Sequence, residues 1–416
     1  MQIVLESPTR KLALLSATLV VAGLYLFLAG RNFLASYFAR SAELGRLQRA
    51  VQLAPASAEY HQMLGRLYFT GNNLREAAQQ YHIATQLNPH EGQYWLELAS
   101  LEQITGDVAK QRYALERAIA AEPTTPEVAW EAGNFFLVQG DAQKALRQFR
   151  VVLENDPTLT YAALQAAAHV ADVNTMLRDV LPPQPDAYLS LIELQIGKKD
   201  LDGAAKVWEG LADLGQPFES RRTLHYINYL IQQRDISQAR LVWRQMAQRC
   251  GLTAYLPSHD NLVVNPSFSL DILNSGFDWH YLREHSVELE LDPTDFHGGH
   301  RSLSIAFEGP GVSEAGIFQF IPVEPDTSYE FSAYYKSDKM DGAGGPRFAV
   351  QDAYSNASYF ESDDLNDADV WRATGGQFKT SPDAQLVVIR LLRVPSGSAI
   401  RGRLWIDDFR LVEKHE

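Results

Sequence analysis

The sequence predicts a multidomain chain that is helical first and β-stranded afterwards: a single transmembrane helix, an α-solenoid of helix-turn-helix repeats, and a C-terminal antiparallel β-sandwich of jelly-roll form. Three observations predict this order. An uncharged apolar run lies near the N-terminus, prolines recur every 34 residues after it, and short alternating runs fill the last 159 residues. We expect a short tail over residues 1–11, an anchor over 12–30, repeats over 31–257 and the sandwich over 258–416.

The charge of the chain is concentrated in the predicted sandwich. The whole sequence has 37 Lys and Arg against 51 Asp and Glu, a net charge of −14, and residues 258–416 hold 13 of the basic and 26 of the acidic residues. A chain with this balance and no basic cluster is not expected to bind nucleic acid. The single cysteine, Cys250, excludes an internal disulfide and a CxxC metal site, and 46% hydrophobic residues exclude wholesale disorder.

The first apolar run is predicted to cross a membrane. Residues 12–29 read LALLSATLVVAGLYLFLA, and at 1.5 Å per residue this run with Gly30 spans about 30 Å. Arg10 and Lys11 also fit a cleaved signal peptide, although the run exceeds the about 7–15 apolar residues of one, and a buried core helix is the third interpretation. Basic residues on both sides leave the orientation nearly neutral, and the nature of the last domain favours a periplasmic bulk.

A 34-residue repeat follows the apolar run. Four prolines mark its period: Pro55, Pro89, Pro123 and Pro157. Small and bulky residues recur in the same register: Gly65, Ala99 and Gly133, then Tyr81, Leu115 and Phe149, then Ala84 and Ala118. Small residues suit the close approach of two antiparallel helices, and bulky ones fill the space between units. The pattern resembles the tetratricopeptide repeat over residues 58–157, and two weaker helix pairs over 158–252 are expected to end the solenoid.

The resemblance implies that a protein partner binds in the groove lined by the first helix of each unit. The groove-facing positions recur at the repeat interval and mix polar with apolar side chains. They are Glu59, Gln62, Arg66, Phe69, Gln93, Leu96, Ser100, Gln103, Glu127, Trp130, Asn134 and Leu137. Arg66 alone does not make a clamp for a terminal carboxylate, and packing between helices is the alternative role for Trp130.

From residue 258 onward the helical periodicity gives way to alternation. Short alternating runs between Gly, Pro, Asp and Ser clusters predict an antiparallel β-sandwich. The runs cover residues 302–307, 317–323, 328–336, 347–352, 386–392 and 404–412. The recognisable segments, in order, are NLVVNPSF at 261–268, Trp279, HGGHRSLSI at 297–305, Trp371 and LWIDDFRL at 404–411. Together they resemble the carbohydrate-binding modules of the galactose-binding-like jelly-roll type over residues 260–413.

This second resemblance implies two sites. A structural calcium ion, which takes six to eight oxygen ligands, would be held by Asp407 with the backbone carbonyls of three residues of one turn. Those residues are His297, Gly298 and Arg301. Ser269 departs from the glutamate frequent at its position, and backbone capping is the alternative role for Asp407. A glycan would lie on a concave sheet against aromatic and polar side chains. Its candidate contacts are Tyr334, Lys336, Arg347, Gln351, Tyr354 and Arg390.

The sequence shows no motif of a catalytic site: no GxSxG, no P-loop, no HExxH and no GxGxxG opening a helix. It therefore predicts a non-enzymatic, membrane-anchored scaffold or adaptor. Its repeats would dock a protein partner, and its sandwich would contact a glycan or a partner at the bacterial cell envelope, in the export or assembly of a polysaccharide. One alternative is a pure protein-interaction subunit of a membrane complex, and another is a polysaccharide-active enzyme. No cofactor besides calcium is expected.

Overall fold

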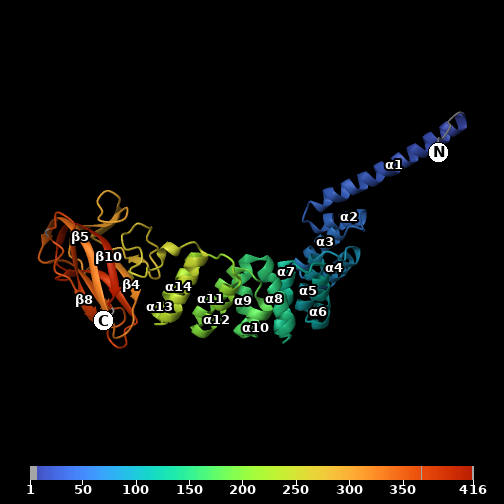
Figure 1. Ribbon diagram of the computed structural model, residues 1–416. Coiled ribbons are helices and arrows are strands. Elements are labelled where there is room, and N and C mark those ends of the chain that lie inside the picture. The colour runs from blue at the N-terminus through green and yellow to red at the C-terminus, as the bar shows by residue number, and fades with distance from the viewer. Residues whose placement is uncertain (1–6, 367, 415–416) are drawn as a thin grey trace. The chain divides into compact units, whose positions relative to one another are not determined.

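The computed structural model describes residues 7–366 and 368–414 and divides into two compact units (Figure 1). Met1–Gln184 holds helices α1 to α10, and Pro185–Glu416 holds helices α11 to α14 followed by two β-sheets. The predicted fold class, helices first and an antiparallel sandwich last, is confirmed. The last four helices share a unit with the sandwich, whereas the domain limits predicted from the sequence stay a prediction.

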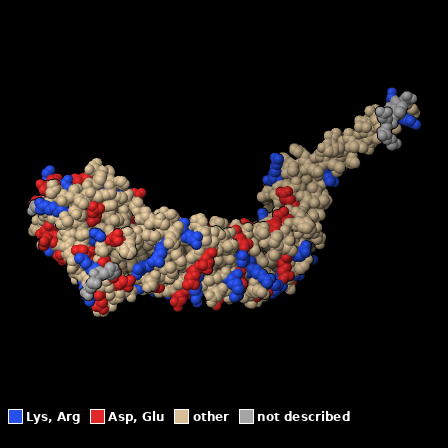
Figure 2. Space-filling model, in the orientation of Figure 1, with Lys and Arg blue, Asp and Glu red and all other residues tan. Residues whose placement is uncertain are grey.

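Helix α1 (Pro8–Ala39) carries the apolar run. Pro8 stands at the first helical position, where its missing N–H leaves no hydrogen bond unmade. The side chains of Leu19 and Leu26 are 65% and 69% exposed, and Figure 2 shows an almost uncharged surface along α1 with basic residues near its two ends. The helix is long and apolar enough to cross a membrane, which is true of an anchor and of a signal sequence alike.

The repeats of the first unit are helix pairs that follow the predicted 34-residue period. The helices after α1 are α2 (Leu44–Leu53), α3 (Ala58–Thr70), α4 (Leu74–Leu87), α5 (Gly92–Thr105), α6 (Val108–Ala121), α7 (Pro126–Val138), α8 (Ala142–Asn155), α9 (Thr160–Ala167) and α10 (Val173–Thr175). A Cβ atom added at Gly65 would lie 2.7 Å from the ring of Tyr81, and one at Gly133 would lie 2.8 Å from the ring of Phe149. Glycine therefore permits the close approach of α3 to α4 and of α7 to α8.

The second unit begins with two further helix pairs. They are α11 (Pro185–Lys198), α12 (Leu201–Asp213), α13 (Ser220–Gln232) and α14 (Ile236–Arg249). The side chains of Asp200 and Asp235 cap α12 and α14 by accepting the N–H of Gly203 and Gln238. Trp208 and Trp243, which stand 35 residues apart, are buried one on each capped helix. These helices keep the architecture of the repeats although the sequence pattern is weaker.

The sandwich consists of two five-stranded antiparallel sheets. Its strands are β1 (Trp279–Tyr281), β2 (Val287–Asp292), β3 (Ser302–Gly309), β4 (Glu314–Pro322), β5 (Ser328–Gly342), β6 (Gly345–Asp352), β7 (Ser358–Glu361), β8 (Arg372–Lys379), β9 (Leu386–Val394) and β10 (Ile400–Glu413). The first sheet has the order β1-β4-β9-β6-β7, and the second sheet has the order β2-β3-β10-β5-β8. Aromatic rings fill the space between the sheets, with Trp279 4.8 Å from Phe409 and Phe348 5.2 Å from Phe409.

Within the second unit, the sandwich packs on α13 and α14 through the loop before β1. The Asn228 side chain donates to the Ser275 hydroxyl and accepts the N–H of Gly276, both at 2.8 Å. The rings of Trp243 and Phe277 lie 5.7 Å apart in an edge-to-face contact. Because one asparagine satisfies two groups of the loop, the loop has a fixed position on the helices.

Candidate binding sites of the repeats and the sandwich

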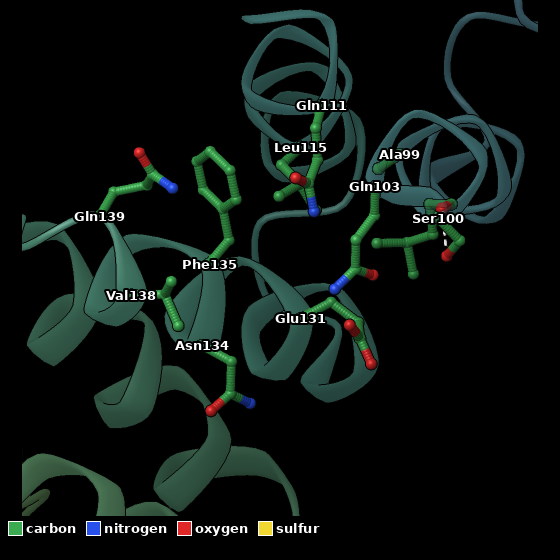
Figure 3. Close-up of a pocket in the computed structure, with 11 residues that line it drawn as sticks. Ala99, Ser100, Gln103, Gln111, Leu115, Glu131, Asn134, Phe135, Val138 and Gln139 are labelled. Atoms are coloured by element: carbon green, nitrogen blue, oxygen red, sulfur yellow. Dashed lines mark hydrogen bonds between the residues drawn. The ribbon is translucent and has the colours of Figure 1, made fainter. Parts of the chain in front are cut away.

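A hollow of about 270 Å³ lies between α5, α6 and α7 (Figure 3). Its lining residues are Leu96, Ala99, Ser100 and Gln103 of α5, Gln111 and Leu115 of α6, and Glu131, Asn134, Phe135, Val138 and Gln139 of α7 or its end. Figure 3 shows the side chains of Gln103 and Glu131 approaching one another from the two first helices. The structure thus brings together four of the predicted groove residues, which are Leu96, Ser100, Gln103 and Asn134.

The hollow combines an apolar floor with polar side chains. Leu115 and Phe135 are buried beneath it. The side-chain amides of Gln103, Gln111 and Gln139 have no hydrogen-bond partner among the residues that the structure describes. An amide both donates and accepts, so these groups can pair with the N–H and C=O of an added peptide.

The preceding part of the groove is closed by bonds within the chain. Gln62 Nε2 and Arg66 Nε each donate to Glu97 Oε1 at 2.6 Å, and Gln93 Nε2 donates to the same oxygen at 3.2 Å. The Glu97 side chain is only 10% exposed. Burial, with the negative charge of Glu97 beside it, raises the pKa of the Tyr81 hydroxyl.

The other predicted groove residues lie on the first helices without entering the hollow. Glu59 and Glu127 are exposed on the first turns of α3 and α7, and Phe69 and Leu137 are half-buried near the ends of these helices. The Trp130 ring lies 6.1 Å from that of Phe149 on α8. This contact agrees with the alternative that Trp130 packs between helices, and the groove itself stays a prediction.

Seven of the eleven residues that line the hollow are absent from the groove predicted from the sequence, among them residues that stand next to predicted positions. Glu131 and Phe135 lie one position beyond predicted groove residues on α7. The repeat spacing could have predicted Glu131, because Glu97 stands 34 residues before it on the same helix face.

Three predicted glycan contacts share the outer face of the first sheet. Arg390 pairs across the strands with Ala349, and Gln351 and Arg347 stand two residues to either side of that alanine. Arg347 donates to Asp364 at 2.6 Å and to Glu361 at 2.7 Å, and these carboxylates raise the pKa of its guanidinium. A register of this kind places the three polar side chains on one surface.

Aromatic rings border these polar groups on the same face. Phe318 stands directly opposite Arg390, and its ring stacks with that of His280 at 4.9 Å. Burial lowers the pKa of His280. Arg390 Nε is buried and finds no hydrogen-bond partner in the described part of the chain, and its guanidinium lies 3.7 Å from Glu314.

The prediction that the six glycan candidates share one sheet is wrong. Tyr334 and Lys336 lie on β5 in the second sheet, where Tyr334 stacks on His297 at 3.7 Å and Lys336 donates to Asp295. Tyr354 leaves the sheets, and its hydroxyl donates to the carbonyl of Ile231 on α13 at 2.7 Å. The reason is physical: alternation along a strand distinguishes inward from outward residues but does not say which of two sheets a strand joins.

The turn before β3 does not fit a calcium ion at Asp407. The Asp407 carboxylate accepts the backbone N–H of His297 at 2.7 Å, of Gly298 at 2.9 Å and of Asp408 at 2.7 Å, and burial raises its pKa to about 6. Arg301 donates through its guanidinium to the carbonyl of Phe268 at 2.5 Å. Amide donors therefore surround Asp407 where carbonyl oxygens were expected.

These bonds agree with the alternative role of Asp407 as a backbone cap. Among residues 7–366 and 368–414, no group of three or more His, Cys, Asp or Glu could hold a metal ion. The donors around Asp407 thus give the predicted calcium ion no support, and that prediction, which no bound ion tests, rests on the sequence resemblance alone.

Two family models match separate parts of the chain. A model described as "Carbohydrate binding domain" matches residues 260–393, and one described as "Tetratricopeptide repeat" matches residues 63–124 and 106–159. Protein O-mannosyl-transferase TMTC1 of Homo sapiens is 33% identical over 87 residues, which are 19% of this chain and 10% of that protein. The chain spans about a tenth of the length of the curated relatives it matches.

Solved structures resemble each part as well. The structure described as "CBM4 structure and function" is 17% identical and covers 36% of this chain and 99% of that chain, with a TM-score of 0.29. The structure described as "Crystal structure of MamA" is 16% identical and covers 41% of this chain and 85% of that chain, with a TM-score of 0.27.

The family models agree with the observed architecture. Residues 63–159 lie within the helix pairs of the first unit, and residues 260–393 cover strands β1 to β9 except for the last residue of β9. The chain therefore joins helix pairs that match the tetratricopeptide-repeat model to a C-terminal sandwich that matches the carbohydrate-binding model, behind one apolar N-terminal helix.

Proposed function

We propose that the chain is a non-catalytic, membrane-anchored adaptor whose repeats take up an extended segment of a protein partner and whose sandwich binds a glycan. The observation that carries the proposal is the hollow of about 270 Å³ between the first helices of two repeats. Its three unpartnered amides, Gln103, Gln111 and Gln139, offer donors and acceptors to a peptide main chain above an apolar floor.

The glycan is assigned to the outer face of the first sheet. Gln351 and Arg390 keep donors that are not used within the described chain, and Phe318 stands beside them. A sugar ring presents an apolar C–H face to an aromatic ring and hydroxyl groups to neighbouring donors. The unused donor of Arg390 supports sugar binding on this face better than on the second sheet, where Lys336 already donates to Asp295.

We further propose that α1 is retained as an anchor and that the bulk of the chain lies on the periplasmic side of a bacterial envelope. The exposed apolar side chains of α1 support the anchor, because a helix without a buried face in the chain must bury its surface elsewhere. A polysaccharide undergoing export or assembly is the glycan that suits an adaptor in this position. A reporter fused at residue 416 tests the orientation, and reporter activity in the cytoplasm would contradict it.

A glycan array read with the full chain in detergent micelles tests the sugar assignment. Gln351→Ala and Arg390→Ala should each lose retention on any glycan that the wild type holds, because each removes a free donor from the proposed face. Gln377→Ala changes an exposed side chain of β8 on the second sheet and serves as the matched control. Equal retention of all variants would contradict the assignment, provided that circular dichroism shows them folded.

A pure protein-interaction subunit is the second candidate. The observation that favours it is that rings on the sandwich are already covered: His280 stacks on Phe318, and Lys336 and Arg403 lie over Trp405 at 5.5 and 5.8 Å. Retention of a peptide by the repeats together with no retention on the glycan array would favour this candidate over the adaptor.

A further inference from the structure

The repeats allow one step of the groove to be compared with the next step, 34 residues further along the chain. At the first step, between α3 and α5, the carboxylate of Glu97 receives Arg66 and Gln62 from the preceding repeat. The side chain of Tyr81 on α4 lies buried beneath it. Glu97 is thus a carboxylate whose charge is neutralised by an arginine of the same chain.

At the second step, between α5 and α7, the carboxylate position is kept but its partners are not. Glu131 corresponds to Glu97, whereas Ser100 corresponds to Arg66. The Ser100 hydroxyl donates back to the carbonyl of Leu96 on its own helix. Glu131 has neither an ion pair nor a hydrogen-bond partner within the described part of the chain.

Other side chains line the second step as well. Leu96 replaces Gln62, and Leu115 replaces Tyr81, so a polar amide and a phenol give way to shorter apolar side chains. The hollow of about 270 Å³ lies here and is lined by Leu96, Ser100, Leu115 and Glu131. The hollow therefore corresponds to the place that the side chain of Arg66 occupies one repeat earlier.

We propose that this hollow is a slot for an arginine side chain of the partner segment, which pairs with Glu131 as Arg66 pairs with Glu97. The inference rests on the proposed function, since it names the chemistry of the segment that the groove takes up. A planar guanidinium matches a carboxylate through two parallel hydrogen bonds, and Glu131 is the only ionisable residue among those that line the hollow. Arg112 of α6 does not fill this role, because its guanidinium lies 5.5 Å over the ring of Phe135.

A variant of the full chain in detergent micelles tests whether the slot accepts a guanidinium. Ser100→Arg places at the second step the residue that occupies the first step, and it should raise the melting temperature above that of Ser100→Gln, the neutral control. In a Glu131→Gln background this gain in melting temperature should disappear, because the carboxylate that receives the guanidinium is gone. Equal melting temperatures of Ser100→Arg and Ser100→Gln in both backgrounds would overturn the slot.

A displayed library of random 12-residue peptides, panned against the full chain in micelles, tests the partner chemistry. Enriched peptides should contain an arginine, and its replacement by citrulline, a neutral analogue, should weaken binding about ten- to hundredfold, the range for hydrogen bonds to charged groups. Glu131→Gln should cause a similar loss, and Ser100→Arg should abolish binding because it fills the slot. Glu76→Gln, an exposed carboxylate on α4, should bind as the wild type does.

The outcomes separate this inference from the proposed function. Peptides that bind without a basic residue, or that bind equally well after Ser100→Arg, would overturn the slot and leave the groove as a peptide site. Equal binding after exchange of arginine for lysine would overturn the assignment to a guanidinium. Failure of every peptide to bind would overturn the proposed peptide groove and the slot together.

Discussion

Asp278 is a carboxyl group that the fold holds in an unfavourable place, at the end of the loop that joins the sandwich to α13 and α14. Its side chain is fully buried. Oδ2 accepts the N–H of Leu273 at 2.7 Å, and Oδ1 is buried without a partner among the described residues. Burial raises its pKa from 3.8 to about 7, and the hydrogen bonds to the backbone oppose this only in part.

The raised pKa converts into a stability difference with a definite sign. Between about pH 4 and pH 7 the folded chain keeps a proton on Asp278 that the unfolded chain has lost, so the free energy of unfolding falls as the pH rises through this window. About three pKa units at about 1.36 kcal/mol each give up to about 4 kcal/mol. Asp278→Asn cannot ionise and keeps an oxygen for Leu273. It should therefore gain nothing over the wild type near pH 4 and up to about 4 kcal/mol above pH 7.

Hydrogen–deuterium exchange of β1 and β9, followed by mass spectrometry in the full chain, measures this gain locally, which suits a chain with two units. Asp363→Asn is the matched control, because Asp363 is exposed. Protection that is the same in wild type and Asp278→Asn at pH 8, or a gain that is already present at pH 4, would contradict a raised pKa of Asp278 in the folded chain.

Gly276→Ala should destabilise the second unit by about 2 kcal/mol, because Gly276 has a φ of 64° and a Cβ atom there would lie 2.4 Å from a tryptophan ring of α14. Gly251→Ala, at a φ of 71° with no atom within 4 Å, should lose less, and equal losses in thermal unfolding would contradict the contact. Arg66→Ala removes the cation from Glu97 and should cost about 1–2 kcal/mol, since the arginine is half exposed; an unchanged melting temperature would count against the pair. EDTA should leave the melting temperature of the sandwich unchanged, because backbone amides already satisfy Asp407, and a fall on chelation would restore the calcium prediction.

The repeat fold could be predicted from the sequence because its signals lie close together in the chain. The exact spacing of the prolines and the small residue at each close approach are both short-range signals, because each helix pair is built from neighbouring residues. The structure places Gly65 against Tyr81 and Gly133 against Phe149, as that spacing requires. The candidate site could be predicted only in part. The groove residues follow from one helix face, whereas the hollow also depends on α6, which contributes Leu115.

Long-range contacts explain what the sequence did not reveal in the sandwich. Alternation predicted that Tyr334 and Arg347 point outward, but strand order decides that they lie on different sheets. Asn228 on α13 forms hydrogen bonds with a loop about 50 residues further along the sequence, and no local sequence pattern predicts such a contact. For the same reason the amide donors around Asp407 could not be distinguished from the carbonyls expected there.

The proposed adaptor holds a protein segment and a glycan on one chain at the same time. The most direct measurement captures the full chain, in detergent micelles, on a glycan retained by the array and then adds a labelled arginine-containing peptide from the selected library. We predict that one peptide binds per captured chain, that Glu131→Gln loses the peptide but not the glycan, and that Arg390→Ala loses the capture. Release of the chain from the glycan by the peptide, or absence of peptide on captured chains, would contradict the account.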